Sequence, residues 1–257
     1  MNILAFFAHP DDETMLAGGT LILLANTGEQ VHYLCATRGE GGEVGEPPLC
    51  TLEELGIVRE KEMRCAVEVL GGASLAFLDY HDPRVGPDNE MFPYTEDINE
   101  LSAQVAEKIT EVKADVVLTH GSNGEYGHPA HVLSHQAARL AVHSLGENAP
   151  GIYTVSASFP GHPKPRLLND DDPAHLVLDI SPVANIKTIA ALCHRTQHAL
   201  FVRRSSAAAG RQMSVPEVII SLESLRRVTP FLADPDTDPL FERLEPWSLK
   251  ELPDAEI

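Results

Sequence analysis

Short apolar runs alternate with longer amphipathic runs along most of the chain, and this alternation restricts the fold more than any other feature. We predict strands over 3–8, 31–36, 75–78, 115–119, 152–156 and 176–180. We predict helices over 12–26, 52–70, 97–112, 129–145, 183–198 and near 216–228. Strands that are apolar throughout and alternate with helices are typical of a parallel sheet covered on both faces. The prediction is an α/β fold, a Rossmann-like three-layer sandwich with a mostly parallel sheet.

Two stretches of the chain look irregular. Residues 39–51 are rich in Gly, Glu and Pro, which favours a mobile loop after the second predicted strand. The last part of the chain is rich in proline and aspartate, so we predict a Pro-rich C-terminal arm over 229–257 that packs on a main domain of residues 1–228. The length of 257 residues suits one domain with an added arm.

The chain carries a strong excess of negative charge. It has 19 Lys and Arg against 38 Asp and Glu, a formal net charge of −19 at pH 7. Nucleic acids and anionic lipid surfaces both attract basic proteins, so we expect neither as a partner. No apolar run approaches the ~18 residues of a membrane-spanning helix, so no membrane span is expected. The sequence leaves a homo-oligomer open.

The four cysteines contain no C-x-x-C pair, which argues against a zinc ribbon or a dithiol redox motif. Cys65 and Cys193 fall in predicted helices and Cys35 in a predicted strand, where an unpaired Cys acts as a small hydrophobe. Unpaired cysteines indicate a reducing cytosol. The N-terminal residues lack the basic segment of a signal peptide and form the first predicted strand, so a cytoplasmic location is expected.

The first predicted strand ends in the sequence Ala-His-Pro-Asp-Asp-Glu, residues 8–13. Helix capping explains one or two of these acids, since Asp is a preferred N-cap and acidic groups favour the first helical turn. Capping does not explain His9 directly before Asp11 and Asp12. One His and two carboxylates form a donor set that suits zinc or another divalent ion. Ligands of open α/β sheets bind at the carboxyl ends of strands, where this group lies.

A second polar cluster follows the fourth predicted strand. Its four histidines, within 16 residues, are His120, His128, His131 and His135. His128 and His131 are three residues apart, so a helix that begins between them brings them close to one face. The metalloprotease motif H-E-x-x-H is excluded, because Val132 stands where the general base must be. We interpret His135, like His143, as an ordinary hydrogen-bonded histidine.

Sheet topology joins the two clusters. In a doubly wound sheet of order 3-2-1-4, strands one and four are neighbours and the loops that follow them open into the same crevice. His9 and Asp12 from one loop and His131 from the other can then supply three ligands, with a fourth position open for water. Three protein ligands and an open position are typical of catalytic zinc, whereas structural zinc is closed by four. Asp11 is then not a ligand and is free to take a proton from that water.

Other functions of α/β folds fit this chain less well. Dinucleotide binding needs G-x-G-x-x-G directly after the first strand, where this chain has carboxylates that would repel a pyrophosphate. The Gly-rich stretch over 39–45 follows a different strand and does not keep that spacing. The nucleophile elbow G-x-S-x-G of the serine hydrolases is absent from the sequence.

At these residues the chain resembles the PIG-L/LmbE-like zinc-dependent N-deacetylases. The match to the family's first motif covers residues 8–13 and continues through Gly18 and Gly19, and residues 128–131 resemble the family's H-P-D-H motif. Weaker matches lie at residues 37–40, Arg59, Glu62, Asp82, Lys187, His194 and Gln197. The resemblance spans residues 3–200 and depends on two distant motifs occurring together.

The resemblance implies a role for each matching residue. His9, Asp12 and His131 are implied as ligands of one Zn²⁺ per chain, and Fe²⁺ or Mn²⁺ suits the same donors. Asp11 is implied as the general base. His128 is implied as the residue that stabilises the oxyanion and helps to protonate the leaving amine. Substrate contacts are implied for three further residues, Arg59, Asp82 and Glu40.

One position departs from the family pattern, because Ala130 stands where the family usually has Asp. An Asp there can orient and charge the neighbouring His. Without it, either the pKa of His128 is lower or another carboxylate takes the place of the Asp, and Glu125 is the candidate. The departure concerns the acid role of His128 and leaves the three expected metal ligands in place.

The resemblance implies hydrolysis of an N-acetyl amide on a small glucosamine-type sugar conjugate by zinc-activated water. Two alternatives stay open: an amidase that cleaves a larger thiol-conjugate amide, and a metal- or sugar-binding relative without catalysis. Release of acetate, release of a larger acid, and tight binding without turnover distinguish the three. The sequence does not name the substrate, because specificity depends on loops such as 39–51 and 82–95.

Overall fold

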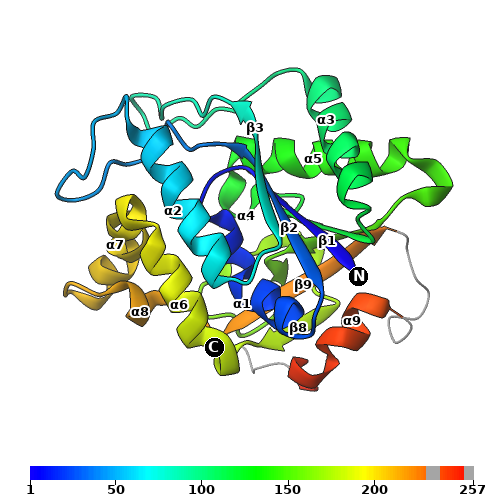
Figure 1. The fold of residues 1–257 in the computed structure, drawn as a ribbon. Helices are drawn as coiled ribbons and strands as arrows, with labels where there is room; N and C mark the ends of the chain where they lie inside the picture. The colour runs from blue at the N-terminus through cyan, green and yellow to red at the C-terminus, as the bar shows by residue number, and fades with distance from the viewer. Residues whose placement is uncertain (230–237, 252–257) are drawn as a thin grey trace.

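The computed structural model describes residues 1–229 and 238–251 and is built around one large sheet (Figure 1). The seven strands follow the order β3-β2-β1-β4-β5-β9-β8. They are β1 (Asn2–Phe7), β2 (Gln30–Thr37), β3 (Ser74–Tyr80), β4 (Val116–Thr119), β5 (Gly151–Val155), β8 (Leu176–Asp179) and β9 (Leu222–Thr229). Neighbours among β1 to β5 are parallel, and β9 is antiparallel to β5 and β8. The predicted α/β fold and its strand order 3-2-1-4 are confirmed.

Helices cover both faces of the sheet, with α1, α2 and α6 on one face and α3 and α5 on the other (Figure 1). Their bounds are α1 (Asp12–Asn26), α2 (Leu55–Val69), α3 (Ile98–Val112), α5 (Pro129–Ser144) and α6 (Ala184–Cys193). Ile3, Ala5 and Phe7 of β1 pack toward α1, whereas Leu4 and Phe6 pack toward α3 and α5. Because alternate side chains of a strand point to opposite faces, this pattern produces the three predicted layers.

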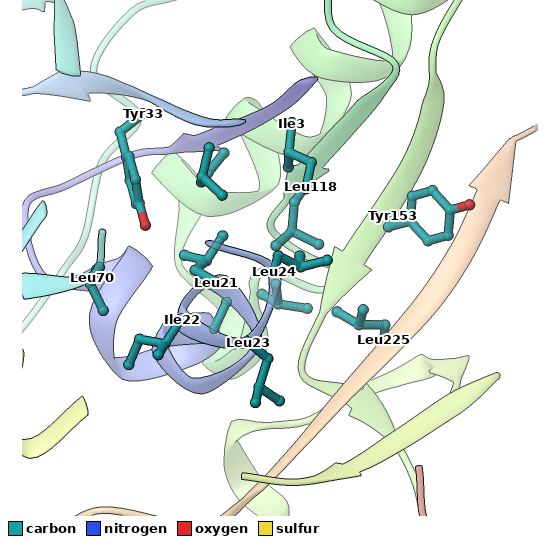
Figure 2. Packing of buried hydrophobic residues seen from close by; sticks show 14 of the residues in the cluster. Ile3, Leu21, Ile22, Leu23, Leu24, Tyr33, Leu70, Leu118, Tyr153 and Leu225 are labelled. Carbon is teal, nitrogen blue, oxygen red and sulfur yellow. The ribbon is translucent and has the colours of Figure 1, made fainter. Parts of the chain in front are cut away.

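The larger core lies between the sheet and α1. Leu21 and Leu24 of α1 pack with Ile3 and Leu118 of the two central strands (Figure 2). Gly19 lets α1 pack closely on Ile180, the residue that follows β8, since a Cβ atom added there would lie 2.6 Å from the Cβ of Ile180. The position of α1, and hence of the residues at its first turn, therefore depends on a glycine at this point.

The remaining elements are short or lie at the edge of the main layers. They are α4 (Gly124–Gly127), α7 (His198–Ala209), α8 (Val215–Val218), α9 (Pro239–Leu244), and the strands β6 (Ala157–Ser158) and β7 (Asn169–Pro173), which pair with each other. Short 3₁₀ turns lie at Gly146–Asn148, Pro165–Leu167, Ser181–Val183, Arg195–Gln197 and Glu245–Trp247. Within residues 1–229 and 238–251, no helix combines the length and the apolar character needed to cross a bilayer.

The helix predicted near 216–228 is wrong, because only the four residues of α8 are helical and β9 follows at Leu222. β9 lies between β5 and β8, so both edges of its backbone are paired. Its buried stretch contains Glu223 and Ser224 beside Leu225. Because of these polar side chains, the sequence lacks the continuous apolar run that usually predicts a buried strand. The predicted helix over 183–198 is also too long. α6 ends at Cys193, and the separate helix α7 was not predicted.

The described part of the predicted C-terminal arm packs on the main domain. Leu240, Phe241 and Leu244 of α9 are buried in the core cluster that contains α1. Asp238 caps α9 by accepting the backbone N–H groups of Leu240 and Phe241 at 2.9 and 3.1 Å. Residues 230–237 and 252–257 of the arm lie outside the described residues, and the boundary between 228 and 229 stays a prediction.

Cys65 and Cys193 form a disulfide that joins α2 to α6, with their Cα atoms 5.8 Å apart. The prediction that these residues act as unpaired small hydrophobes is therefore wrong. They are separated by 128 residues, and only the packing of α2 against α6 brings them together. Cys35 and Cys50 are free. The expectation of a reducing compartment depended on unpaired cysteines and loses that support.

Candidate active site

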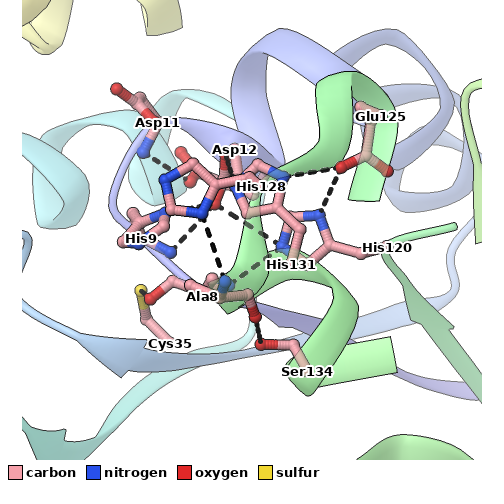
Figure 3. Close-up of polar contacts among 12 residues, drawn as sticks. Ala8, His9, Asp11, Asp12, Cys35, His120, Glu125, His128, His131 and Ser134 are labelled. Carbon is pink, nitrogen blue, oxygen red and sulfur yellow. Dashed lines mark hydrogen bonds and ion pairs between the residues drawn. The ribbon is translucent and has the colours of Figure 1, made fainter. Parts of the chain in front are cut away.

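The two polar clusters predicted from the sequence meet at the carboxyl ends of β1 and β4. These strands are parallel neighbours, with Phe6 opposite Thr119, so the loops that follow them leave the sheet side by side. His9 lies in the turn after β1, Asp12 begins α1, and His131 lies in the first turn of α5 (Figure 3). The expected crevice between strands one and four thus brings the three predicted metal ligands together.

The three side chains are buried and within contact distance. Asp12 Oδ1 lies 3.3 Å from His131 Nε2, and Asp12 Oδ2 lies 3.3 Å from His9 Nδ1. The rings of His9 and His131 have their centroids 5.3 Å apart. Asp12 also accepts the backbone N–H of His9 at 2.9 Å, which fixes its carboxylate toward the turn. The arrangement places two imidazoles around one carboxylate.

The donor atoms of this cluster fit a divalent cation. His131 Nδ1 lies 2.6 Å from Glu125 Oε2 and donates to it, so when the ring is neutral its lone pair is on Nε2. This Nε2 is buried and has no hydrogen-bond partner. Two groups of donor atoms lie within 4.8 Å of one another, His9 with His128 and His131, and Asp12 with His120 and His131. An unpaired nitrogen beside a buried carboxylate is the feature that a bound cation would complete.

The charges at the site also favour a cation. Burial lowers the pKa of His9 and His131, but Asp82 and Asp12 outweigh it and raise the pKa of His9 to about 10. For His131, Asp12 and Glu125 raise the pKa to about 9. Burial raises the pKa of Asp12, yet His131 and His120 hold it well below its usual value. In the metal-free protein the imidazoles thus keep protons that a divalent ion can replace.

Asp11 lies beside the cluster and belongs to neither group of close donor atoms. It is the N-cap of α1 with a φ of 109°, and its backbone N–H donates to Glu13 Oε2 at 3.0 Å. Glu13 is fully buried and is also in contact with His194 Nε2 at 3.0 Å. Burial raises the pKa of Asp11 to about 6 although Arg59 opposes the shift. The backbone of Asp11 is therefore held by Glu13, which is in turn held by its contact with the buried His194.

Arg59 lies under the turn that carries Asp11. Its guanidinium is 3.1 Å from Asp11 Oδ2 and donates to the carbonyl oxygens of Gly39, at 2.9 Å, and Pro10. Arg59 is only 3% exposed, and both of its terminal nitrogens, Nη1 and Nη2, are bound by other groups of the protein. Its predicted contact with substrate stays a prediction, and the structure adds a contact with Asp11 that the sequence did not indicate.

Asp82 and Glu40 lie on the other side of His9. Asp82 Oδ1 is 3.3 Å from His9 Nε2, and the backbone N–H of Asp82 donates to Glu40 Oε2 at 3.1 Å. Asp82 is buried and Glu40 is half-buried. Asp82 thus contacts His9 directly and Glu40 lies behind it, bound to its backbone, and their predicted contact with substrate stays a prediction.

His128 is half-buried, and its ring stacks on that of His131 with centroids 4.6 Å apart. Its Nδ1 accepts the backbone N–H of Ala130 at 3.2 Å, so the neutral ring carries its proton on Nε2. Burial, His9 and His131 lower the pKa of His128 to about 3. The direction agrees with the lowered pKa expected at His128, but its causes are burial and the two neighbouring histidines, and the effect of Ala130 itself stays a prediction.

The expected partnership between Glu125 and His128 is wrong. Glu125 contacts Nδ1 of His131 and, at 3.0 Å, Nδ1 of His120 instead. The sequence places His120 in the second cluster but predicts no role for it. Its position directly after a buried strand is the one feature that could have indicated a role at the site. His135 is a hydrogen-bonded core residue as expected, with Nδ1 2.9 Å from the carbonyl oxygen of His120. His143 is exposed.

Proteins of known structure with a similar fold are named for different reactions. The 4-carboxy-2-hydroxymuconate hydratase GalB from Pseudomonas putida superposes with a TM-score of 0.62 at 23% identity, covering 91% of this chain and 98% of the hydratase. The N,N'-diacetylchitobiose deacetylase from Pyrococcus horikoshii has a TM-score of 0.61 at 19% identity, covering 88% and 83% of the two chains. These similarities establish the α/β fold and leave the reaction to be argued from the site.

Sequence relatives are more specific. A 1D-myo-inositol 2-acetamido-2-deoxy-alpha-D-glucopyranoside deacetylase from Geodermatophilus obscurus is 36% identical over 161 residues, and the match covers 58% of this chain and 55% of the relative. The enzyme of that name from Rhodococcus erythropolis is 30% identical over 263 residues, covering 86% and 89%. The chain spans about half the length of the first of these relatives. The family model described as PIG-L, GlcNAc-PI de-N-acetylase, matches residues 4–142, more than half of the chain, and this protein therefore belongs to the PIG-L family.

Proposed function

We propose that this protein is a zinc-dependent hydrolase that removes the N-acetyl group from a small glucosamine-type sugar conjugate. The observation that carries the proposal is that Asp12 contacts both His9 and His131, whose buried Nε2 has no hydrogen-bond partner, with the separate carboxylate of Asp11 beside them. Relatives named for the deacetylation of an acetamido-glucopyranoside of inositol support this choice of substrate class.

His9, Asp12 and His131 would hold the cation, and three protein ligands leave a position open for water and substrate. Zn²⁺ bound there supplies a Lewis acid that activates water and polarises the acetyl carbonyl, and Fe²⁺ or Mn²⁺ can use the same nitrogen and oxygen donors. The ligands are held by the fold itself, because two of them lie in or next to the first turn of α1 and the third in the first turn of α5.

Asp11 would act as the general base. Its carboxylate takes a proton from the attacking water, and a pKa raised to about 6 makes it a better proton acceptor than an ordinary aspartate while leaving it mostly ionised at pH 7. The proton then passes to the nitrogen of the leaving amine as the amide bond breaks. The αL backbone at Asp11, held by Glu13, fixes the direction of the side chain during this transfer.

His128 would stabilise the oxyanion that forms on the acetyl carbonyl. Its Nδ1 accepts a backbone N–H, so its Nε2–H is available as a donor to the developing negative charge. Its predicted help in protonating the amine requires a charged ring, and the lowered pKa disfavours that form. We therefore assign hydrogen-bond donation to the oxyanion as the main role of His128. The residue that delivers the proton to the leaving amine is then Asp11.

Substrate binding would use the polar groups around His9. Asp82 and Glu40 can accept hydrogen bonds from sugar hydroxyls at the edge of the site. Arg59 is a donor only and is held by Asp11 and the backbone of Gly39, so it would influence the substrate indirectly through these groups. Two carboxylates at this edge suit a neutral or cationic amino-sugar conjugate better than an anionic one.

The proposal is tested by an acetate-release screen over N-acetylglucosamine conjugates with metal-stripped and zinc-reloaded protein. We expect acetate from at least one conjugate with the reloaded protein, and a rate restored by zinc from near zero in the stripped protein. Release of a larger acid would identify an amidase instead. Substrate binding by the zinc-loaded protein with no product would identify a non-catalytic relative.

A further inference from the structure

Glu125 is a buried carboxylate whose side chain is fully enclosed between the two histidines of the second cluster and the small β6–β7 sheet. Its Oε2 accepts hydrogen bonds from His131 Nδ1 at 2.6 Å and His120 Nδ1 at 3.0 Å (Figure 3). Its Oε1 accepts from the backbone N–H of Gly121 at 3.0 Å and from Asn169 Nδ2 at 3.2 Å. Four donors point at one carboxylate, so each of its oxygens is saturated.

The backbone at Glu125 is unusual for a residue with a side chain. Its φ of 59° and ψ of −78° lie outside the regions that L-residues favour. Asn169 Oδ1 holds the backbone N–H of Glu125 at 3.0 Å, while Asn169 Nδ2 binds its carboxylate. Backbone conformations of this kind persist only where the surroundings fix them, and they are concentrated at functional sites. The fold thus holds both ends of this residue in place.

The contact with Glu125 decides which nitrogen of His131 is free. Donation from Nδ1 to the carboxylate leaves the lone pair of the neutral ring on Nε2, the buried atom without a hydrogen-bond partner. That atom faces Asp12 Oδ1 at 3.3 Å. With the other tautomer, Nε2 would carry a proton and could not bind a cation.

The second contact decides the same question for His120. Its Nδ1 donates to Glu125, and its Nε2 accepts the backbone N–H of Ala8 at 3.0 Å. His120 is therefore occupied on both nitrogens, and it holds the end of β1 directly before His9. Its ring also stacks on that of His131, with centroids 3.9 Å apart and planes 18° from parallel. One carboxylate is thus connected to His131 in α5 and, through His120 and Ala8, to His9 in the turn after β1.

We propose that Glu125 is the positioning residue of the metal centre. It holds both His131 and His120 as Nδ1–H tautomers, which presents His131 Nε2 to the cation and, through His120 and Ala8, fixes the turn that carries His9. The inference depends on the proposed function, because it assumes a cation between His9, Asp12 and His131. Carboxylates that orient metal-bound histidines typically change metal affinity 10- to 100-fold when they are removed.

The test is Glu125→Gln, measured first by zinc affinity in competition with a chelator. An amide keeps one acceptor oxygen, and its NH₂ group must then face two N–H donors, either the two histidines or Gly121 and Asn169, so the four-donor arrangement is lost. We expect zinc affinity to fall about 10- to 100-fold. In ¹H–¹⁵N spectra of the zinc-loaded wild type, His131 and His120 are expected to carry protons on Nδ1, and the His120 signature is expected to change in the variant.

Asp238→Asn is the matched control, since Asp238 is a buried carboxylate that accepts from Tyr153 and from the N-terminus of α9, away from the site. It is expected to lower stability and leave zinc affinity unchanged. Glu125→Asp keeps the charge but is one methylene shorter, so an intermediate affinity is expected, and it replaces the Gln variant if that one does not fold.

The outcomes separate the two proposals. Zinc binding by the wild type with the same affinity in Glu125→Gln and Glu125→Asp overturns the positioning role alone. Zinc binding that falls in the Glu125 variants, in a wild type that releases no acid from any conjugate, supports the positioning role and overturns the proposed reaction. A wild type that binds no zinc, iron or manganese overturns both.

Discussion

Two of the buried polar clusters that contact α1 differ in how fully the protein itself satisfies their polar atoms. The first is the pair of Lys187 and Glu223, 2.7 Å apart. Glu223 also accepts the backbone N–H groups of Gly19 and Thr20 at 2.8 and 2.7 Å, and Lys187 donates to the carbonyl oxygen of Met15 at 3.1 Å. This cluster is closed by the protein itself.

The second cluster, at the first turn of α1, is not closed in this way. His131 Nε2 has no hydrogen-bond partner, and the rings of His9 and His131 are both turned toward Asp12. The comparison teaches that burial of charge alone does not mark a functional site. A cluster satisfied by its own fold contributes to stability, whereas one with unused donor capacity is completed by a ligand.

The largest effect is expected from His131→Ala. It removes one of three ligands, so the purified protein should lose its zinc on dialysis and all measurable acetate release with it. Metal content per chain, by elemental analysis, is the measurement. His143→Ala is the control, because that ring is exposed and away from the cluster. One zinc per chain in His131→Ala would show that the ion is held elsewhere.

A smaller loss is expected from Asp11→Asn. The amide cannot take a proton from water, so kcat should fall roughly 10²- to 10⁴-fold. Zinc content should stay near that of the wild type, because Asp11 is in neither group of close donor atoms. A rate close to the wild type would rule out Asp11 as the base.

Lys187→Met is expected to affect stability and not the metal. The side chains of Lys187 and Glu223 are 2% and 3% exposed, and removal of one partner of a buried pair typically costs about 3–5 kcal/mol of unfolding free energy. Urea unfolding measures this change, and chelator competition should give an unaltered zinc affinity. If zinc affinity falls as steeply as stability does, the two clusters are not independent.

The smallest effect is a pH dependence confined to the metal-free protein. The pKa values of His9 and His131 rise from 6.5 to about 10 and about 9 on folding, so the folded state binds these protons more tightly. Their contribution to stability is complete below pH 6.5 and is lost as the pH rises through 9 and 10. The melting temperature of the metal-free protein should therefore fall more between pH 6.5 and 10 than that of the zinc-loaded protein. Parallel curves for the two forms would contradict the assigned shifts.

The sequence was sufficient for the parts of the molecule that depend on local pattern and chain order. The position of α1 followed from an apolar run after a capping sequence, and its predicted range matches the observed bounds. The meeting of His9 with His131 followed from the rule that neighbouring parallel strands share one edge. The first inference needs only the local sequence, and the second needs only the order of strands, which the alternation of strands and helices restricts strongly.

The parts that failed depend on contacts between distant residues. Glu223 made β9 look unlike a buried strand, because its partner Lys187 is invisible in the local sequence. The disulfide of Cys65 with Cys193 arises from the packing of two helices. Glu125 was the candidate partner of His128 and instead contacts His131 and His120, because its position depends on a strained backbone angle and on Asn169 in another sheet.

The close packing of Gly19 against Ile180 limits which amino acids can occupy position 19 of this protein. A helix rises about 1.5 Å per residue, so Gly19 lies roughly 10 Å along α1 from Asp12. Even a methyl group at position 19 would press on Ile180, and a rigid helix would carry the displacement to the aspartates at its start. Amino-acid exchange at position 19 is therefore restrained by the geometry of the candidate metal site as well as by packing.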